Sequence, residues 1–379
     1  MTERRARLFT PGPTEIPAAV YAALATPLLP ARSPAFAQRL ARVAARLREV
    51  FLTGGDVVTL TASGTGALEA AFANLVRRGD TVLVAHAGKF GERWVELARA
   101  FGVAHRALTA PWGEPVTPAA LAAALADTPR ADVVFLTHSE TSTGVVHDVQ
   151  ALARTVRAHG DALVVVDAVS SAGALPLHMD AWGIDACVAA AHKGFLCPPG
   201  LAFLAVGERA RARAAGADLP RFYFDLAPAL AGVRDGGTPW TPAVSLVNAL
   251  DRALELLLAD GLAQAWARTA RLAEATRAGV RAGGLELFAR PPGDAVTAVC
   301  TPAGLDAREV VRALRPRGFE IAAGQDRIKR RVFRIAHLGS IQDADLLALM
   351  DALQAVLEEL GAAPRPPGAL RAAAAAALA

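Results

Sequence analysis

The sequence predicts an α/β protein in which a mostly parallel sheet is covered by helices on both faces. Short, continuously apolar runs alternate with alanine-rich helical stretches between about residues 56 and 206. Strands of this kind are typical of a sheet that is buried on both sides and joined by right-handed crossovers. The chain has 379 residues, 53% of them hydrophobic, which is enough for about two domains with large cores.

The elements of this sheet can be expected at definite places. Strands are predicted at residues 57–60, 82–84, 133–136, 163–166 and 202–206. Helices are predicted at residues 67–76, 91–101 and 149–159, where apolar residues recur at helical spacing.

The pattern changes after about residue 240. Two long helices are expected at 244–258 and 262–281, followed by strands at 295–300 and 331–336 and helices at 307–315 and 343–360. We therefore expect a large domain over residues 15–258. A small α+β domain is expected over residues 259–362, together with an N-terminal arm, residues 1–14. The Ala- and Pro-rich tail, residues 363–379, is predicted to be frayed or weakly helical.

Charge and composition argue against nucleic-acid binding. The formal net charge is only +4, aromatic residues make up 6% of the chain, and one short stretch, Arg327–Arg331, is locally basic. A protein that binds phosphate backbones usually has a concentrated basic face with interleaved aromatic residues. We read the basic stretch as a solvated loop; its alternative role is to steer or select anionic substrates such as dicarboxylates.

Cysteine usage and hydropathy predict a cytoplasmic protein. The three cysteines, Cys187, Cys197 and Cys300, are scattered and form no CxxC pair, so we expect neither a disulfide framework nor a metal site. Pro11 and Pro13 interrupt the N-terminus before a signal sequence could form. No run of about 18 apolar residues suggests a membrane span.

The first candidate for a functional site is the segment from Ala62 to Glu69, which follows a strand and opens a helix. Its small residues would let a ligand approach the backbone, and the free N–H groups of a helix start attract phosphate. The segment fits an ordinary helix N-cap equally well.

The second candidate is Asp167, which ends the apolar strand 163–166. Open α/β sheets bind ligands at the carboxyl ends of their strands. Taken alone, the residue is better explained as the N-cap of a following turn.

The third candidate is Lys193, a lone lysine that follows the apolar run Ala189–Ala191 and His192. Burial disfavours the charged form of lysine, so an amine in apolar surroundings usually has a task. The alternative is a surface lysine at the end of a strand. Together, a phosphate cradle, a strand-end acid and a desolvated amine fit pyridoxal phosphate.

With these three features the chain resembles the class V aminotransferases, a family of fold-type-I pyridoxal-phosphate enzymes that includes alanine:glyoxylate, serine:pyruvate and related aspartate aminotransferases. The resemblance runs from Thr10–Thr14 to about Leu338–Gly339. The segments between them that resemble the family are Arg32–Pro34, Lys89–Trp94, Thr137–Gly144, His192–Gly194, Pro198–Gly200, Thr241–Leu246 and Phe333–His337. The resemblance implies the fold of these enzymes, with a seven-stranded sheet in the large domain and a small C-terminal α+β domain.

The resemblance also implies roles in cofactor binding. Lys193 would hold pyridoxal 5'-phosphate as a Schiff base and move a proton between Cα and C4′, and Asp167 would pair with the pyridine nitrogen. The other cofactor-binding residues that it implies are Ser63, Gly64 and Thr65 for the phosphate, Phe90 and Val169 for the two ring faces, and Thr141 for the ring hydroxyl. Trp94, one helical turn from Phe90, is better explained by helix packing.

Three further positions carry implications of the resemblance. His192 precedes the lysine, where many aminotransferases have Gln and cysteine desulfurases have His. Thr241 falls in the segment that in relatives reaches the phosphate of the neighbouring subunit, which implies a homodimer with composite active sites. Arg334 matches the arginine that binds the substrate carboxylate with its guanidinium fork. Without the resemblance, a solvated arginine on an edge strand is the simpler interpretation.

The predicted activity is a ping-pong transamination from alanine, serine or aspartate to a short 2-oxo acid such as glyoxylate or pyruvate. The segment Thr241–Leu246 looks closer to the aspartate-using members. The alternative enzyme is a cysteine desulfurase or other lyase on the same fold, which would need a nucleophilic cysteine on a mobile loop. Cys300 instead falls in a predicted strand, and Cys187 and Cys197 are better explained by packing. Outside enzymes, the alternatives are a pyridoxal-phosphate-binding regulator and an inactive scaffold.

Overall fold

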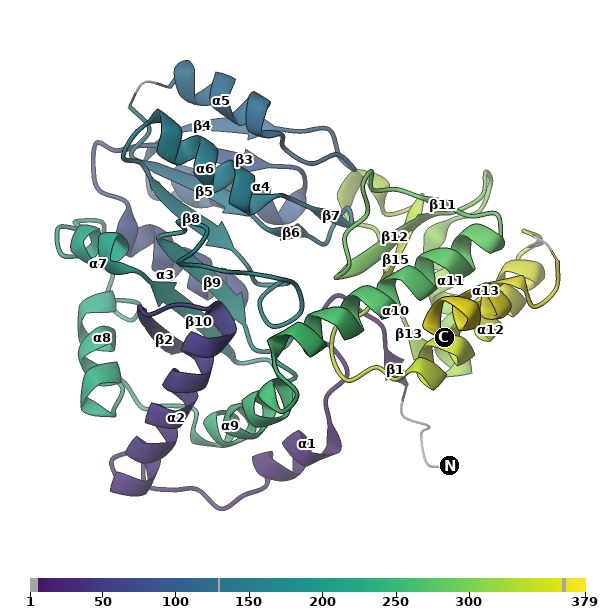
Figure 1. Ribbon diagram of the computed structural model, residues 1–379, viewed down its shortest axis with the longest axis horizontal. Coiled ribbons are helices and arrows are strands. Elements are labelled where there is room, and N and C mark those ends of the chain that lie inside the picture. The colour runs from purple at the N-terminus through teal and green to yellow at the C-terminus, as the bar shows by residue number, and fades with distance from the viewer. Residues whose placement is uncertain (1–5, 129, 363–365) are drawn as a thin grey trace.

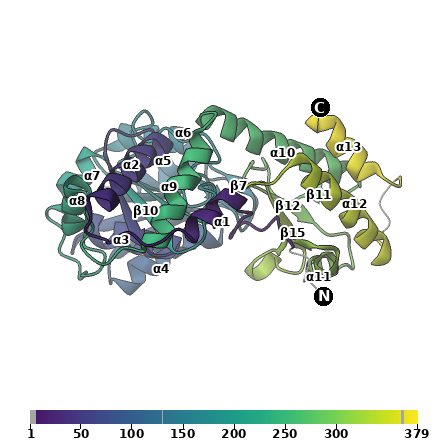
Figure 2. The ribbon, with the colours of Figure 1, turned by 90° about the horizontal axis from the view of Figure 1, so that it is seen from below.

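The fold is described from a computed structural model, which covers residues 6–128, 130–362 and 366–379. It consists of a larger part built on a seven-stranded sheet and a smaller part built on a four-stranded sheet (Figure 1). The long helix α10 (Leu262–Ala282) runs from one part to the other (Figure 2). Its start, Leu262, packs into the core under the large sheet, whereas Leu272 and Val280 belong to the core of the smaller part.

The large sheet has the strand order β2-β10-β9-β8-β5-β3-β4. In chain order its strands are β2 (Asp56–Thr61), β3 (Thr81–His86), β4 (Ala104–Thr109), β5 (Val133–Thr137), β8 (Leu163–Asp167), β9 (Ala186–Ala190) and β10 (Leu201–Val206). β10 is antiparallel to both of its neighbours, and the other strands pair in parallel where they adjoin. The predicted fold class and the five predicted strands are confirmed. Two strands, β4 and β9, are not among the predicted ones: the largely exposed sequence of β4 lacks an apolar run, and β9 is mostly alanine, which is a weak strand former.

Helices cover both faces of this sheet, as the apolar strands require. Side chains that alternate along β5 enter different cores: Val134 and Leu136 face one, Val133 and Phe135 the other. The first face is covered by α2 (Pro34–Phe51), α5 (Pro118–Ala126), α6 (Val149–His159) and α9 (Val244–Leu258). The second face is covered by α3 (Gly64–Leu75), α4 (Lys89–Ala100), α7 (Glu208–Ala214) and α8 (Leu226–Asp235).

The carboxyl ends of the central parallel strands meet at one edge of the sheet. The register pairs Thr137 at the end of β5 with Asp167 at the end of β8. The chain leaving β5 forms a small hairpin at this edge, made of β6 (Ser139–Glu140) and β7 (Val145–Val146). This edge is therefore where segments from several crossovers come together.

The smaller part contains an antiparallel sheet with the order β11-β12-β15-β14. Its elements are β11 (Glu286–Leu287), β12 (Val296–Cys300), α11 (Ala307–Leu314), β14 (Ala322–Ala323), β15 (Val332–Ala336) and α12 (Asp343–Glu359). Near the N-terminus, β1 (Arg7–Leu8) pairs in parallel with β13 (Phe319–Glu320) and is followed by α1 (Ala18–Leu24). The division of the chain into domains at residue 258 stays a prediction.

The C-terminal tail is more ordered than the sequence suggests. Residues 363–365 lie outside the described residues, but Ala369–Leu378 form the helix α13. Its Leu370 and Ala374 are buried in the core of the smaller part. A Cβ atom at Gly279 of α10 would lie 2.8 Å from the Leu370 carbonyl oxygen, so glycine permits this close packing. Of the two predicted alternatives for the tail, frayed or weakly helical, the structure shows a helix over Ala369–Leu378, which packs against α10.

Candidate active site

Lys193 lies in the turn that follows β9, and its side chain is only 7% exposed. Its Nζ donates a hydrogen bond to the carbonyl oxygen of Pro11 at 2.6 Å. Gly12 has a φ of +151°, and a Cβ atom there would lie 3.0 Å from Nζ, so both the backbone conformation and the close approach favour glycine. Thr14 Oγ1 also donates to the Lys193 carbonyl oxygen, at 3.2 Å. The N-terminal segment therefore forms one wall of the site.

The amine of Lys193 is tuned toward its neutral form. Burial lowers its pKa to about 8, while the negative charge of Asp167 opposes the shift and Arg334 and Arg93 add to it. A neutral amine is the form that attacks a carbonyl carbon. The alternative of a surface lysine is wrong, because the group is buried among charged residues of the same site.

Asp167 ends β8 and is buried. Its Oδ1 accepts a hydrogen bond from the Val169 N–H at 2.8 Å. Burial raises its pKa to about 6; the Val169 hydrogen bond and the positive charge of Lys193 oppose the rise, whereas Glu140 adds to it. The carboxylate thus also caps the turns that follow β8, as the alternative interpretation expects, so the capping role and a place in the site are compatible.

The residues predicted for the two faces of a cofactor ring lie near this pair. The Lys193 Nζ is 5.9 Å from the centroid of the Phe90 ring. The Val169 side chain lies against Gly64, where an added Cβ would be 3.0 Å from Val169 Cγ2. Trp94 is fully buried and stacks on Phe135 at 4.3 Å between ring centroids, so its predicted packing role is confirmed.

Ser63, Gly64 and Thr65 lie at the start of α3. The Ser63 side chain caps the helix by accepting from the Gly66 N–H at 3.4 Å. Thr65 Oγ1 accepts from Arg93 Nη1 at 3.0 Å, which brings a positive charge beside this helix start. The cap and the anion site are therefore compatible interpretations, because capping uses one N–H group and leaves the other N–H groups of the first turn free to bind a phosphate.

Arg334 brings the smaller part into the site. It lies on β15, between β12 and β14, and is 5% exposed, so the alternative of a solvated arginine on an edge strand is wrong. Its Nη1 donates to the Thr141 carbonyl oxygen at 2.8 Å, and its Nε and Nη2 donate to that of Ala323 at 3.0 and 2.7 Å. Burial lowers its pKa to about 10, so it stays a cation at neutral pH.

The structure also contains an unsatisfied group that a ligand could bind. Thr141 is fully buried, and its Oγ1 has no hydrogen-bond partner within the described residues. Buried hydroxyl groups are nearly always hydrogen-bonded, so this one suits a ligand oxygen at that position.

The two remaining predicted residues differ in their placement. His192 adjoins Lys193, its ring lies against Gly12, and burial lowers its pKa to about 4, so it is neutral. Thr241 instead lines a surface pocket with Thr59, Thr61 and Leu201, and no other predicted site residue lines that pocket. Within a single chain, the described contacts do not bring Thr241 to Lys193.

Sequence reasoning assigned no role to three residues that the site uses. Pro11 provides the carbonyl for Lys193, Arg93 bonds Thr65, and Glu140 bonds the start of α4. All three lie in segments that resemble the family. A glycine between two prolines was the one signal for a close backbone approach at Gly12.

Cys300 lies in β12, as predicted, whereas Cys187 lies in β9 and Cys197 in the loop before β10, both buried as a packing role requires. Burial raises the pKa of all three thiols, that of Cys197 to about 12. A nucleophilic cysteine needs a lowered pKa and an accessible position. These thiols therefore do not support desulfuration.

A buried amine, a strand-end carboxylate and a buried guanidinium thus lie together at one edge of an α/β sheet, where this class of fold places its ligands. The Aminotransferase class-V family model matches residues 8–337. The chain therefore belongs to the class-V aminotransferase family, and its activity is that of an aminotransferase.

Aminotransferases are among the proteins that are similar to this chain. The chain is 37% identical to the L-aspartate–glyoxylate aminotransferase of Paracoccus denitrificans, over 93% of this chain and 91% of that one. It is 43% identical, over 96% of both chains, to a Synechococcus protein named soluble hydrogenase, small subunit. The crystal structure of pyridoxamine–pyruvate aminotransferase from Mesorhizobium loti superposes with a TM-score of 0.94 at 30% identity, over 99% of this chain and 97% of that one.

A cysteine desulfurase is a more distant neighbour. The enzyme from Thermococcus onnurineus NA1 is 16% identical, with a TM-score of 0.75, which shows a shared fold alone. The helices of the described residues include none that is long and apolar enough to cross a membrane.

Proposed function

We propose that this aminotransferase uses pyridoxal 5'-phosphate to transfer the amino group of alanine, serine or aspartate to glyoxylate or pyruvate, in ping-pong order. The observation that carries the proposal is the meeting of Lys193, Asp167 and Arg334 at one edge of the large sheet. The names of relatives, which include aspartate–glyoxylate and serine–glyoxylate aminotransferases, support the choice of substrates.

The residues present fit this cofactor. Among the residues that the structure describes, no carboxylate is hydrogen-bonded to the buried Lys193 amine and nothing satisfies the Thr141 hydroxyl, which is therefore available to the ring oxygen. Phe90 and Val169 would enclose the ring. The first turn of α3 (Ser63, Gly64, Thr65) would bind the phosphate, with His192 beside the ring. When bound, pyridoxal phosphate supplies an electron sink for the charge that develops as an amino acid loses its Cα proton.

The side chains of this chain would perform the remaining tasks. Lys193 would accept and return the substrate Cα proton, since an amine with a pKa near 8 can both accept and donate a proton at neutral pH. Asp167 holds a proton at the pyridine nitrogen by a charge-assisted hydrogen bond. The burial of both groups excludes water from them.

Arg334 would bind the substrate carboxylate with the guanidinium hydrogens that Ala323 and Thr141 leave free. We expect Arg334→Lys to lower kcat/KM roughly 30-fold or more, because lysine cannot form the bidentate pair with the carboxylate. This factor corresponds to a loss of about 2 kcal/mol of transition-state stabilisation. Steady-state kinetics would measure this. Arg312→Lys, on the exposed face of α11, is the control. An unchanged kcat/KM in the Arg334 variant would remove it from the substrate site.

The proposal can be tested by absorption spectroscopy of the purified protein with pyridoxal phosphate. Alanine, serine, aspartate and cysteine are added in turn, without any oxo acid. Loss of the near-visible cofactor band with one of the first three identifies the donor, because the amino group then stays with the enzyme. Sulfide release from cysteine would instead support a desulfurase. Failure to bind pyridoxal phosphate at all would reject the cofactor.

Two relatives have names that denote hydrogenase subunits, at 43% and 41% identity. We base the function on the site instead, since its amine, carboxylate and guanidinium are the groups that transamination requires. Within residues 6–128, 130–362 and 366–379, no group of three or more His, Cys, Asp and Glu side chains is arranged to hold a metal ion.

We also propose a cytoplasmic homodimer in which Thr241 reaches the phosphate of the neighbouring subunit. The aromatic cluster beside Thr241 supports a partner on this surface: Phe222 is 75% exposed, and its ring centroid lies 4.9 Å from that of Trp240. Sedimentation would test the dimer. Mixing Lys193→Ala and Thr241→Val subunits should restore activity, because one of the two composite sites is then intact; no recovery would mean that each site is formed by one chain.

A further inference from the structure

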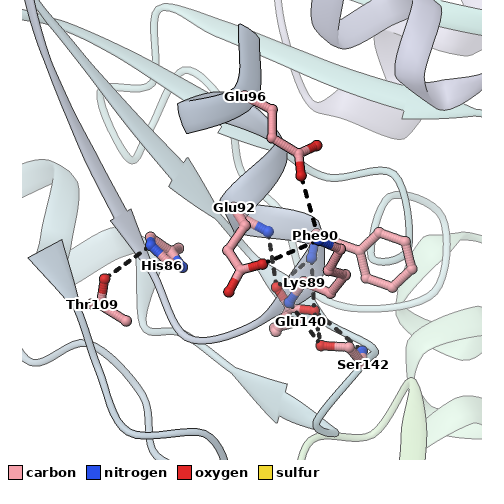
Figure 3. A network of polar contacts seen from close by, with 9 residues as sticks. His86, Lys89, Phe90, Glu92, Glu96, Thr109, Glu140 and Ser142 are labelled. Atoms are coloured by element: carbon pink, nitrogen blue, oxygen red, sulfur yellow. Dashed lines mark hydrogen bonds and ion pairs between the residues drawn. The ribbon is translucent and has the colours of Figure 1, made fainter. Parts of the chain in front are cut away.

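Glu140 is a fully buried carboxylate at the edge of the proposed cofactor site (Figure 3). Both of its oxygens accept hydrogen bonds from N–H or O–H groups of neighbouring residues. Oε2 accepts from the N–H groups of Phe90 and Gly91 at 3.0 and 2.9 Å. Oε1 accepts from the Ser142 N–H at 3.2 Å and from the Ser142 hydroxyl at 2.5 Å. Burial raises the pKa of Glu140, and these bonds oppose the rise.

These contacts attach the start of α4 to the hairpin that follows β5. The residue before α4, Gly88, provides no side-chain cap, so Glu140 performs that task from another segment. The approach is close: a Cβ atom at Gly88 would lie 2.7 Å from the Glu140 side chain and 2.5 Å from Ser142 Oγ. The position of the Phe90 ring above the Lys193 amine therefore depends on Glu140.

The same carboxylate influences the other side of the site. Glu140 immediately precedes Thr141, whose carbonyl oxygen accepts from Arg334 and whose hydroxyl is unsatisfied. Its negative charge also raises the pKa of Asp167 and that of Arg334. Glu140 thus contacts or influences groups contributed by α4, β8 and β15.

We propose that Glu140 is a positioning residue that fixes the places of Phe90, Thr141 and Arg334, so that they can bind the cofactor and the substrate carboxylate. The proposal rests on the proposed use of pyridoxal phosphate for its functional consequence. The role requires a carboxylate. In glutamine one of the two oxygens becomes an N–H₂ group, which would face the donors that this oxygen accepts from and could not bond to their N–H groups.

The test compares Glu140→Gln with Asp148→Ala. Asp148 is a matched control because its carboxylate also accepts from a first-turn N–H, that of Ala151 at 2.9 Å, but at the exposed start of α6. Quenching of the fluorescence of the five tryptophans would measure pyridoxal-phosphate affinity. Near-visible circular dichroism would report the orientation of the bound ring, and kinetics would separate kcat from KM.

We expect Glu140→Gln to weaken cofactor binding about tenfold or more, to change the dichroic band and to raise KM for the amino donor. Asp148→Ala should lower the melting temperature without these changes. Cofactor affinity, dichroism and KM equal to those of the wild type in Glu140→Gln would overturn the proposal, even if the melting temperature falls.

A second readout does not depend on the cofactor. In the cofactor-free full-length protein, amide hydrogen exchange at Phe90 and Gly91 should accelerate about tenfold in Glu140→Gln, while the first turn of α6 is unchanged. Unchanged exchange in Glu140→Gln would reject Glu140 as the positioning group, whether or not pyridoxal phosphate binds. If the wild-type protein does not bind pyridoxal phosphate, only the proposed function is rejected. If Glu140→Gln does not fold, Ser142→Ala decides, with a smaller shift expected in the same direction.

Discussion

Lys193→Ala is expected to lower kcat by at least about 10⁴-fold, because the variant loses both the amine that binds the cofactor carbonyl and the group that moves the Cα proton. Its fold should persist, since alanine leaves the surrounding turn and its backbone contacts unchanged. The Lys193 amine donates one hydrogen bond, to Pro11. Single-turnover kinetics would measure the loss, and borohydride reduction followed by peptide mass analysis would detect the missing covalent cofactor.

The chain contains only three lysines, which makes this experiment easy to interpret. Lys329→Ala, in the exposed basic loop, is the control and should retain both activity and the reducible cofactor at Lys193. If borohydride reduction still attached the cofactor covalently to the Lys193→Ala variant, another amine would be the one that binds it.

Asp167→Asn is expected to have opposite effects on activity and stability. Activity should fall about 10³-fold, because a neutral amide cannot hold a proton at the pyridine nitrogen. The cofactor-free protein, however, should become more stable at pH 8. Asn retains an oxygen that can accept from the Val169 N–H, and it removes a carboxylate whose ionisation is unfavourable in this buried position.

The pH dependence of this gain follows from the direction of the shift. The pKa of Asp167 is about 6 in the folded protein and about 3.8 when unfolded. The cost of ionisation is therefore absent below about pH 4, grows as the pH rises to 6 and is constant above it, reaching at most about 3 kcal/mol. Urea unfolding of both cofactor-free proteins at pH 8 and pH 5 would measure it. A variant that is less stable at pH 8 would contradict the assigned pKa shift.

Part of this site could be predicted because it depends on local pattern. Asp167 follows a continuously apolar strand and Lys193 follows an apolar run, so each is visible as a polar group at a strand end. Arg334 looked like an edge-strand residue because its burial depends on the pairing of β15 with β12 and β14, which the pattern of one strand does not contain.

The missed residues depend on contacts between distant segments. Pro11 and Lys193 are 182 residues apart, and Glu140 is 50 residues from Phe90. No sequence pattern predicts that a proline carbonyl will accept a hydrogen bond from a lysine. A glutamate in a polar segment is expected to be exposed to solvent, and its burial follows only from the packing of α4 against the hairpin. The strand β4 was missed for a related reason, because its largely exposed surface gives no hydrophobic periodicity.

The pairing of β1 with β13 has a consequence for the order in which the protein can be completed during synthesis. Arg7–Leu8 precede their partners, Phe319–Glu320, by more than 300 residues, so they are synthesised long before them. Until then the Pro11 carbonyl lacks the strand that anchors its segment beside Lys193. The large sheet can form cotranslationally, since its strands end at Val206, whereas the wall over the amine closes only afterwards. The Lys193 amine of a nascent chain therefore stays without this wall until Phe319–Glu320 have been synthesised.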